Sequence, residues 1–208
     1  KDQPNLIKES DLINPEDPYG RTKFTVENLL QDIFKNPLSN WQIANLRYFN
    51  PIGAHESGLI GEFYSENTSN IFPIICEVAA GKRKYLEIYG SDYPTKDGTC
   101  IRDFIHIMDL TKGHLAALNY ISKAKSEFIS VNLGRGKGVS VLELVKTFQE
   151  ENKCKIPTKF VERRVGDKPI VVADNSLALN IFNWIPKKNI QKMCSDGWKW
   201  KGFCESRI

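Results

Sequence analysis

A tyrosine and a lysine four residues apart, Tyr19 and Lys23, are the side chains of this sequence best suited to proton chemistry. Residues with this spacing share one face of a helix, so the lysine ammonium can lie close to the phenol. At about 5 Å and an effective dielectric constant of about 20, such a charge favours a phenolate by roughly 3 kcal/mol. It would bring a tyrosine pKa of about 10 down by about 2 units, toward the range of a general base. A solvated surface pair is the commoner origin of this spacing, so the assignment depends on the rest of the chain.

The residues around this pair predict a helix followed by a strand. Asp17 is a good N-cap, Pro18 suits the first helical position, and apolar periodicity continues to about Phe34. The short apolar run 42–48 is typical of a buried parallel strand. Helix then strand indicates a right-handed crossover unit, so we expect residues 1–50 to end a doubly wound sheet.

Two residues after this strand are placed to meet a ligand. Phe49 and Asn50 follow its carboxyl end, where open α/β sheets bind ligands, although an Asn-Pro turn that merely ends the strand is the alternative. The polar stretch 55–69 is long enough for a substrate lid. Hydrophobic periodicity and turn residues predict the remaining elements. These are strands at 85–89, 100–107, 128–133 and 158–162, and helices at 70–80, 109–124, 140–151, 177–182 and 190–200.

Three further features each allow two interpretations. The glycine-rich stretch 134–138 is either a phosphate loop or a tight turn before a helix with a Ser140–Glu143 capping box. The arginines of 163–167 suit bidentate phosphate binding, but paired arginines are more often solvated. His114 lies on or beside the apolar face of its helix, and no suitably spaced carboxylate or cysteine favours a metal site.

Composition is that of an ordinary globular protein, with 41% hydrophobic and 26% charged residues. The net charge of +4 is spread along the chain, which argues against nucleic acid and is compatible with an anionic small substrate. No segment resembles a transmembrane helix or a signal peptide. The five scattered cysteines fit free thiols in a reducing cytoplasm. A candidate base stands near Lys1 with no nucleotide-binding segment before it, so we expect the C-terminal part of a longer protein.

Five segments together resemble the UDP-glucose 4-epimerase family of extended short-chain dehydrogenases/reductases. The segments are 17–23, 46–55, 98–110, 131–134 and 163–167. Each is a modest signal alone, but their order and spacing are specific and extend over almost the whole chain. The resemblance implies an α/β fold, with the end of a doubly wound, Rossmann-like parallel sheet and a smaller α/β substrate-binding lobe. We expect residues 1–50 in the NAD-binding domain and 51–208 mainly in the UDP-sugar lobe, with 100–125 as a candidate to return to the first domain.

The resemblance also implies the reaction, which is interconversion of UDP-glucose and UDP-galactose through transient oxidation at the sugar C4 with tightly bound NAD. Tyr19 would be the acid–base group, while Lys23 would assist it and hold the nicotinamide ribose. Tyr48 and Phe49 would line the nicotinamide side. A homodimer is implied for the full-length protein, and UDP-N-acetylglucosamine is a further candidate substrate.

A larger set of residues is implied for the UDP-sugar. It comprises Tyr48, Phe49, Asn50, Ser69, Asn70, Ile71, Glu87, Ile88, Tyr89, Arg102, Arg164, Val165, Gly166, Asp167 and Val171. In the resembling family, positions matching Arg102 and Arg164 neutralise the diphosphate, Asp167 lies near the uridine ribose, and Val171 closes the hexose end.

Several departures from the family pattern bear on activity. The glycine-rich loop that binds the NAD pyrophosphate is not in the sequence, nor is the Ser/Thr that shares the sugar proton with Tyr19. We therefore expect the 208 residues alone neither to retain NAD nor to turn over. Ser69 replaces the usual Asn, and 63–65 replaces a more polar stretch. Two alternatives stay open: another NAD-dependent sugar-nucleotide reductase or dehydratase, and a non-catalytic UDP-sugar-binding fragment.

Overall fold

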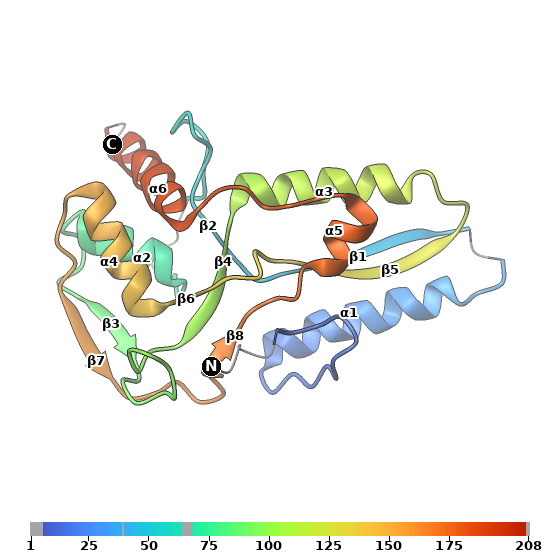
Figure 1. Ribbon diagram of the computed structural model, residues 1–208, viewed down its shortest axis with the longest axis horizontal. Coiled ribbons are helices and arrows are strands. Elements are labelled where there is room, and N and C mark those ends of the chain that lie inside the picture. Colours follow the sequence, from blue (N-terminus) through green and yellow to red (C-terminus); the bar gives the residue numbers. More distant parts are fainter. Residues whose placement is uncertain (1–5, 39, 64–67, 207–208) are drawn as a thin grey trace.

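The computed structural model describes residues 6–38, 40–63 and 68–206, and it has an α/β architecture in two parts (Figure 1). The elongated part contains α1 (Pro18–Phe34), β1 (Gln42–Tyr48), α3 (Ile107–Ile121), β5 (Glu127–Leu133) and α5 (Ser176–Phe182). The second part contains α2 (Ile71–Ala79), β3 (Leu86–Tyr89), α4 (Val141–Asn152), β7 (Thr158–Val161) and α6 (Ile190–Glu205). Short strands connect them, namely β2 (Asn50–Ile52), β4 (Ile101–His106), β6 (Gly138–Ser140) and β8 (Ile170–Val171).

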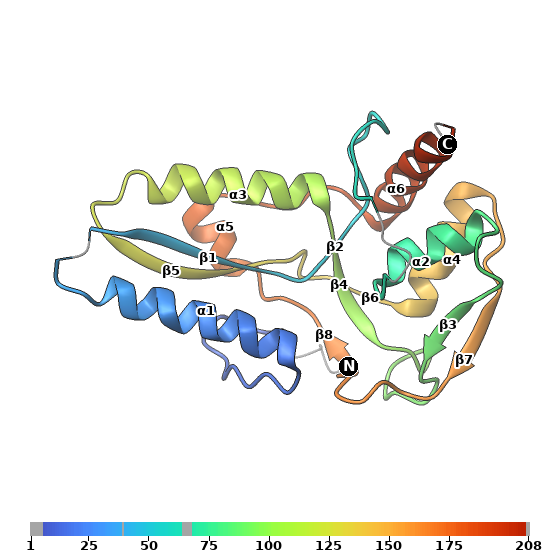
Figure 2. The same cartoon turned by 180° about the vertical axis from the view of Figure 1, so that it is seen from behind.

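The predicted helix and strand at the start of the chain are confirmed. Asp17 caps α1 by accepting the backbone N–H of Gly20 at 2.8 Å, and Pro18 occupies the first turn. β1 pairs in parallel with β5 from Gln42 opposite Glu127 onward. Helices α1 and α3 lie on opposite sides of this strand pair (Figures 1 and 2). Helix, strand and crossover therefore follow the doubly wound pattern expected from the sequence.

Each part has its own hydrophobic core. In the elongated part, α3 and α5 cover one face of β5, with Leu110, Val131 and Phe182 among the buried residues. In the second part, α2, α4 and α6 pack around Phe72, Phe148 and other buried side chains. The elongated part and the second part are therefore packed around separate cores, and the sheet that contains β4 lies between them.

β4 is the central strand of the connecting sheet. It pairs in parallel with β2 and β8 and antiparallel with β6, while β3 and β7 form a separate parallel pair. The sequence analysis did not predict β2, β6 or β8, because strands of two or three residues are too short to show periodicity.

Some predicted boundaries were wrong. α3 begins at Ile107 rather than Asp109, because the His106 imidazole accepts the Met108 N–H at 3.0 Å and caps the helix. Leu118 of the same helix is 62% exposed, although it is one of the apolar residues of the predicted segment. α6 extends to Glu205, beyond the predicted end. The predicted lid at 55–69 includes 64–67, which lie outside the described residues.

Candidate functional site

Ten of the predicted substrate-binding residues line one cavity of about 800 Å³. They are Asn50, Ser69, Asn70, Ile71, Glu87, Ile88, Tyr89, Arg102, Arg164 and Asp167. They come from the start of β2, the start of α2 and the residues just before it, strands β3 and β4 and the loop after β7. Cavities of this size are typical of small-molecule and cofactor sites.

Other predicted site residues are not in the cavity wall. Val165 is fully exposed, and neither Tyr48, Phe49 nor Gly166 lines the cavity. Val171 lies in β8, half-buried, opposite Arg102 of the neighbouring strand.

Sequence reasoning missed several cavity residues. They are Thr68, Ile74, Arg83, Lys84, Tyr85, Leu86, Cys100, Phe104 and Val141. Arg83 and Lys84 directly precede the predicted strand 85–89, so two cations beside a strand already placed in the site were the available signal. The apolar members are contributed by tertiary packing and had no local signal.

Arg102 is held in place by protein groups. One terminal nitrogen donates to the carbonyls of Ile101 at 3.0 Å and Lys168 at 2.8 Å, and the other forms a 3.2 Å ion pair with Asp167. The side chain is only 17% exposed. This cation is thus fixed at the cavity wall before any ligand arrives, which lowers the entropic cost of binding an anion.

The two neighbouring arginines have different surroundings. The Arg164 guanidinium stacks over the Tyr89 ring at 3.8 Å, and the Tyr89 hydroxyl donates to Glu87 at 3.0 Å. Arg163 instead pairs with Asp92 at 2.7 Å. The bond to Arg163 holds the pKa of Asp92 below its usual value. Of the pair, only Arg164 lines the cavity.

Tyr19 and Lys23 lie together on α1, as their spacing predicts. The Lys23 ammonium is 5.1 Å from the centre of the Tyr19 ring, and Tyr19 is 72% exposed. At the carboxyl end of β1, Tyr48 is 52% exposed and its ring lies 5.6 Å from that of His114. Because Asn50 is two residues further on and lines the cavity, this end of β1 adjoins the cavity.

The glycine-rich stretch 134–138 is a turn closed by an internal carboxylate. Asp103 accepts the backbone N–H of Arg135 at 2.8 Å, of Gly136 at 2.9 Å and of Ala173 at 3.2 Å. Burial raises the pKa of Asp103, and these N–H groups act against that shift. Since two N–H groups of this stretch already bind an internal carboxylate, the structure favours the tight turn over the phosphate loop. The capping box of the following helix is confirmed.

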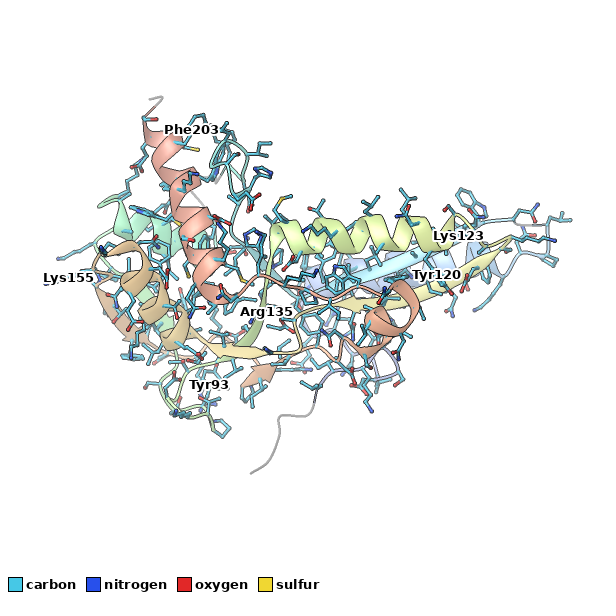
Figure 3. All side chains as sticks on the ribbon, turned by 45° about the horizontal axis from the view of Figure 1, so that its top comes forward. Tyr93, Tyr120, Lys123, Arg135, Lys155 and Phe203 are labelled. Atoms are coloured by element: carbon cyan, nitrogen blue, oxygen red, sulfur yellow. The ribbon has the colours of Figure 1, made fainter. Side chains whose placement is uncertain are left out.

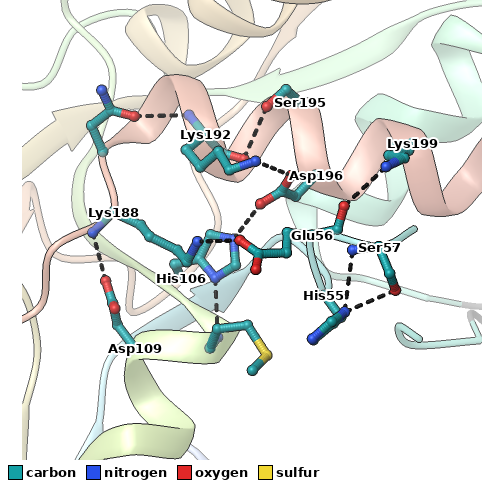
Figure 4. A network of polar contacts seen from close by, with 12 residues as sticks. His55, Glu56, Ser57, His106, Asp109, Lys188, Lys192, Ser195, Asp196 and Lys199 are labelled. Carbon is teal, nitrogen blue, oxygen red and sulfur yellow. Dashed lines mark hydrogen bonds and ion pairs between the residues drawn. The ribbon is translucent and has the colours of Figure 1, made fainter. Parts of the chain in front are cut away.

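A buried polar network joins β4 to α6 (Figure 4). His106 is fully buried, and its Nε2 donates to Asp196 at 3.1 Å. The other Asp196 oxygen accepts from Lys192 at 2.7 Å. Burial lowers the pKa of His106, and the bond to Asp196 opposes this. The network had no signal in the sequence, because its members are far apart in the chain and single histidines are uninformative.

No group of three or more His, Cys, Asp or Glu side chains suited to a metal ion occurs among the described residues. In the same part of the chain, no helix is both long and apolar enough to span a bilayer. All five cysteines are free thiols, as predicted.

Comparison with known proteins shows which proteins the chain resembles. The family model described as GDP-mannose 4,6 dehydratase matches residues 1–197. The UDP-glucose 4-epimerase of Dictyostelium discoideum is 45% identical over 197 residues, which is 95% of this chain and 57% of that protein. The chain spans about half the length of the curated relatives it matches.

Solved structures agree with these relatives. The UDP-glucose-4-epimerase of Stenotrophomonas maltophila, with bound NAD and formylated UDP-arabinopyranose, superposes with a TM-score of 0.94 at 40% identity. That match covers 100% of this chain and 61% of the other. The epimerase of Bifidobacterium longum in complex with NAD⁺ and UDP gives 0.91 at 37% identity, covering 98% and 60% of the two chains.

Proposed function

Because the chain belongs to the family that the GDP-mannose 4,6 dehydratase model describes, within the extended short-chain dehydrogenases/reductases, we propose that it provides the acid–base pair and UDP-sugar cavity of an NAD-dependent UDP-glucose 4-epimerase. The observation that carries the proposal is the cavity itself. It brings Arg102, Arg164 and the Tyr89 ring together with Asn50, the first residue of β2. A nucleoside diphosphate sugar offers the matching groups, namely a diphosphate, a flat base and sugar hydroxyls.

The cavity residues would bind and orient the substrate. Arg102 and Arg164 would neutralise the diphosphate, since guanidinium groups match phosphate oxygens with paired hydrogen bonds. Tyr89 would lie against the uracil, and Asn50 would contact the sugar. Holding the sugar in a fixed orientation supplies much of the rate enhancement in such a reaction.

Tyr19 and Lys23 would carry the proton chemistry. The Tyr19 phenol would take the proton of the sugar 4-hydroxyl and return it after the sugar has turned over in the site. The Lys23 ammonium, 5.1 Å from the ring centre, favours the ionised phenol electrostatically. The sugar must rotate while its nucleotide stays bound, so tight diphosphate contacts and few fixed sugar contacts suit this reaction.

The residues present fit the nicotinamide end of NAD. Tyr19 and Tyr48 are both more than half exposed, and Lys23 has no ion-pair partner in the part of the chain that the structure describes. Tyr48 and Phe49 would line the ring, and Lys23 would hold the ribose. When bound, NAD supplies the hydride acceptor and donor at the sugar C4. The 208 residues include no glycine-rich loop for the pyrophosphate, so we expect no turnover from them alone.

The remaining features of the proposal concern organisation. We assign residues 1–50 to the dinucleotide-binding domain and 51–208 mainly to the UDP-sugar lobe, with 100–125 returning to the first domain because α3 packs against β1. β5 is added to the first domain, because it pairs with β1. Exposed apolar side chains on α1 and α3, such as Leu29 and Leu118, support a homodimer. The free cysteines support a cytoplasmic location.

UDP-N-acetylglucosamine is proposed as a second substrate because the residue at 171 is a small valine.

Tyr19→Phe in the complete protein containing these residues tests the proposal. Loss of the phenol should lower kcat by about 10²- to 10⁴-fold and leave UDP affinity unchanged, because the hydroxyl acts only when the proton moves. Tyr120→Phe is the matched control. Tyr120 lies at the C-terminal end of α3 (Figure 3), and its hydroxyl donates to Glu127 of β5. Analysing the product from UDP-glucose separates UDP-galactose from a dehydrated 4-keto sugar. Near-normal turnover in Tyr19→Phe would remove Tyr19 as the base.

A further inference from the structure

Glu27 of α1 and Arg47 of β1 form an ion pair that the proposed chemistry does not use. Both Glu27 oxygens accept from the guanidinium, one from Nε at 3.0 Å and the other from a terminal nitrogen. Ser130 of β5 donates a further bond to Glu27 at 3.2 Å. The Arg47 and Glu27 side chains are only 24% and 20% exposed. A bidentate, partly buried ion pair of this kind fixes the orientation of both side chains.

The position of Glu27 on α1 determines which side chains it can reach. Glu27 follows Lys23 by four residues, as Lys23 follows Tyr19. Lys23 therefore has two neighbours within reach on the helix surface, a phenol on one side and a carboxylate on the other. Its ammonium lies over the Tyr19 ring, and it forms no ion pair among the described residues. Glu27 is turned toward the sheet instead.

Without a partner, the Glu27 carboxylate would compete for Lys23. An ammonium is attracted more strongly by an unpaired, partly buried carboxylate than by the face of an exposed aromatic ring. We propose that Arg47 is a positioning residue for Tyr19: it keeps the Glu27 carboxylate on the sheet side of α1 and so leaves the Lys23 ammonium at the phenol. The consequence for catalysis rests on the proposed function, whereas the position of Lys23 does not.

The other charged and titratable groups near these residues are already engaged. On the N-terminal side of α1, the Asp17 carboxylate accepts the Gly20 N–H. In the segment before α1, the Glu9 carboxylate accepts the Asn132 N–H, and the Glu9 carbonyl accepts from Arg47. On β1, Tyr48 lies against His114 of α3. Within the described residues, Arg47 is the cation that contacts Glu27.

The first test is the NMR shift of the Lys23 ε-methylene protons in the complete protein. The Tyr19 ring moves this signal upfield, and its loss in Tyr19→Leu assigns it. We expect Arg47→Gln to abolish the upfield shift, and Glu27→Gln and the double variant to keep it. Arg163→Gln is the control, because it breaks an exposed ion pair far from α1 in the sequence. Arg47→Lys keeps the positive charge but cannot make the bidentate hydrogen bonds, so we expect an intermediate upfield shift of the Lys23 signal. This variant also serves as the test if Arg47→Gln does not fold.

The second test is the pH profile of kcat with UDP-glucose. Arg47→Gln should move the profile to higher pH by about one unit, which is a tenfold loss on its low-pH side. The double variant should return the profile to that of the wild type. If the pair were only a clamp between helix and strand, the double variant would behave like Arg47→Gln.

Two outcomes would overturn the inference. One is an unchanged Lys23 shift in both Arg47→Gln and Arg47→Lys; the other is a double variant that fails to restore it. Neither depends on turnover, so the NMR result decides the position of Lys23 even if Tyr19→Phe were to show that the proposed function is wrong.

Discussion

The cavity lined by Arg102 and Arg164 and the face of α1 that carries Tyr19 differ in how completely the chain surrounds them. The cavity is bounded by α2, β3 and β4 and rests on a core that includes Phe72 and Phe148. α1 contains no buried residue, and it exposes Val26 and Leu29 as well as Tyr19. Substrate binding and proton transfer would therefore be supported by different parts of the fold, and substitutions in one should leave the other measurable.

The largest effect expected on the cavity side of this comparison is that of Arg164→Ala. Once a diphosphate covers the guanidinium, losing the charged contact should weaken UDP binding by roughly 2 kcal/mol, about 30-fold. Because the Arg164 side chain stacks on the Tyr89 ring and forms no ion pair among the described residues, thermal stability should stay the same. Calorimetric titration of UDP is the measurement.

Arg163→Ala is the matched control, since the neighbouring guanidinium pairs with Asp92 outside the cavity. Equal loss of affinity in both variants would mean that general charge, rather than a contact in the cavity, attracts the nucleotide. Arg102→Ala is a poorer probe, because it also removes bonds to two backbone carbonyls.

The cavity and α1 also differ in how far the sequence could predict them. The α1 helix, β1 and the capping box at Ser140 follow from local signals, namely caps, periodicity and short-range hydrogen bonds. Cavity residues such as Glu87 and Tyr89 were placed by resemblance to a family. Leu86, Phe104 and Val141 reach the cavity only through tertiary packing, for which no local pattern exists.

The carboxylates show why site assignment from sequence is limited. Asp103 lies in a segment that matches the family, yet its role is to hold the 134–138 turn through backbone N–H groups. Glu27 gave no signal at all, because its partners Arg47 and Ser130 are distant in the chain. Pairing of this kind is set by the register of β1 against β5 and the packing of α1.

A smaller effect is expected from His106, which joins the two parts through Asp196. Since burial lowers its pKa, the unfolded chain takes up a proton near the ordinary value of about 6.5, where the folded chain does not. Stability should therefore be complete above that pH and fall as the pH decreases through the folded-state pKa. The free energy of unfolding, measured by urea titration between pH 8 and 5, tests this.

His106→Gln is the variant for this test, because its amide can still donate to Asp196 while the cap on Met108 is lost. At pH 8 it should cost about 1 kcal/mol, as for a lost helix cap. It should also flatten the pH dependence of stability. An unchanged slope would assign the pH dependence to other groups.

The smallest effect is expected at Val171, which lies in β8 opposite Arg102 and which the family resemblance assigns to the hexose end. If Val171 closes the hexose end, as the resemblance implies, valine would leave room that a bulky aromatic would fill, and an N-acetyl group would then be admitted in the wild type. Val171→Tyr should therefore lower kcat/KM for UDP-N-acetylglucosamine relative to UDP-glucose. Val171 is paired with Arg102 but does not itself line the cavity, so the change in the ratio should stay near 1 kcal/mol, at the low end for steric discrimination.

Val171→Ile controls for the added volume, since one further methylene on a β-branched side chain fits the same strand geometry and should leave the ratio unchanged. UDP affinity should be measured alongside, because a tyrosine that displaced Arg102 would weaken binding of both sugars equally. A ratio that is the same in wild type and Val171→Tyr would show that position 171 does not select the sugar.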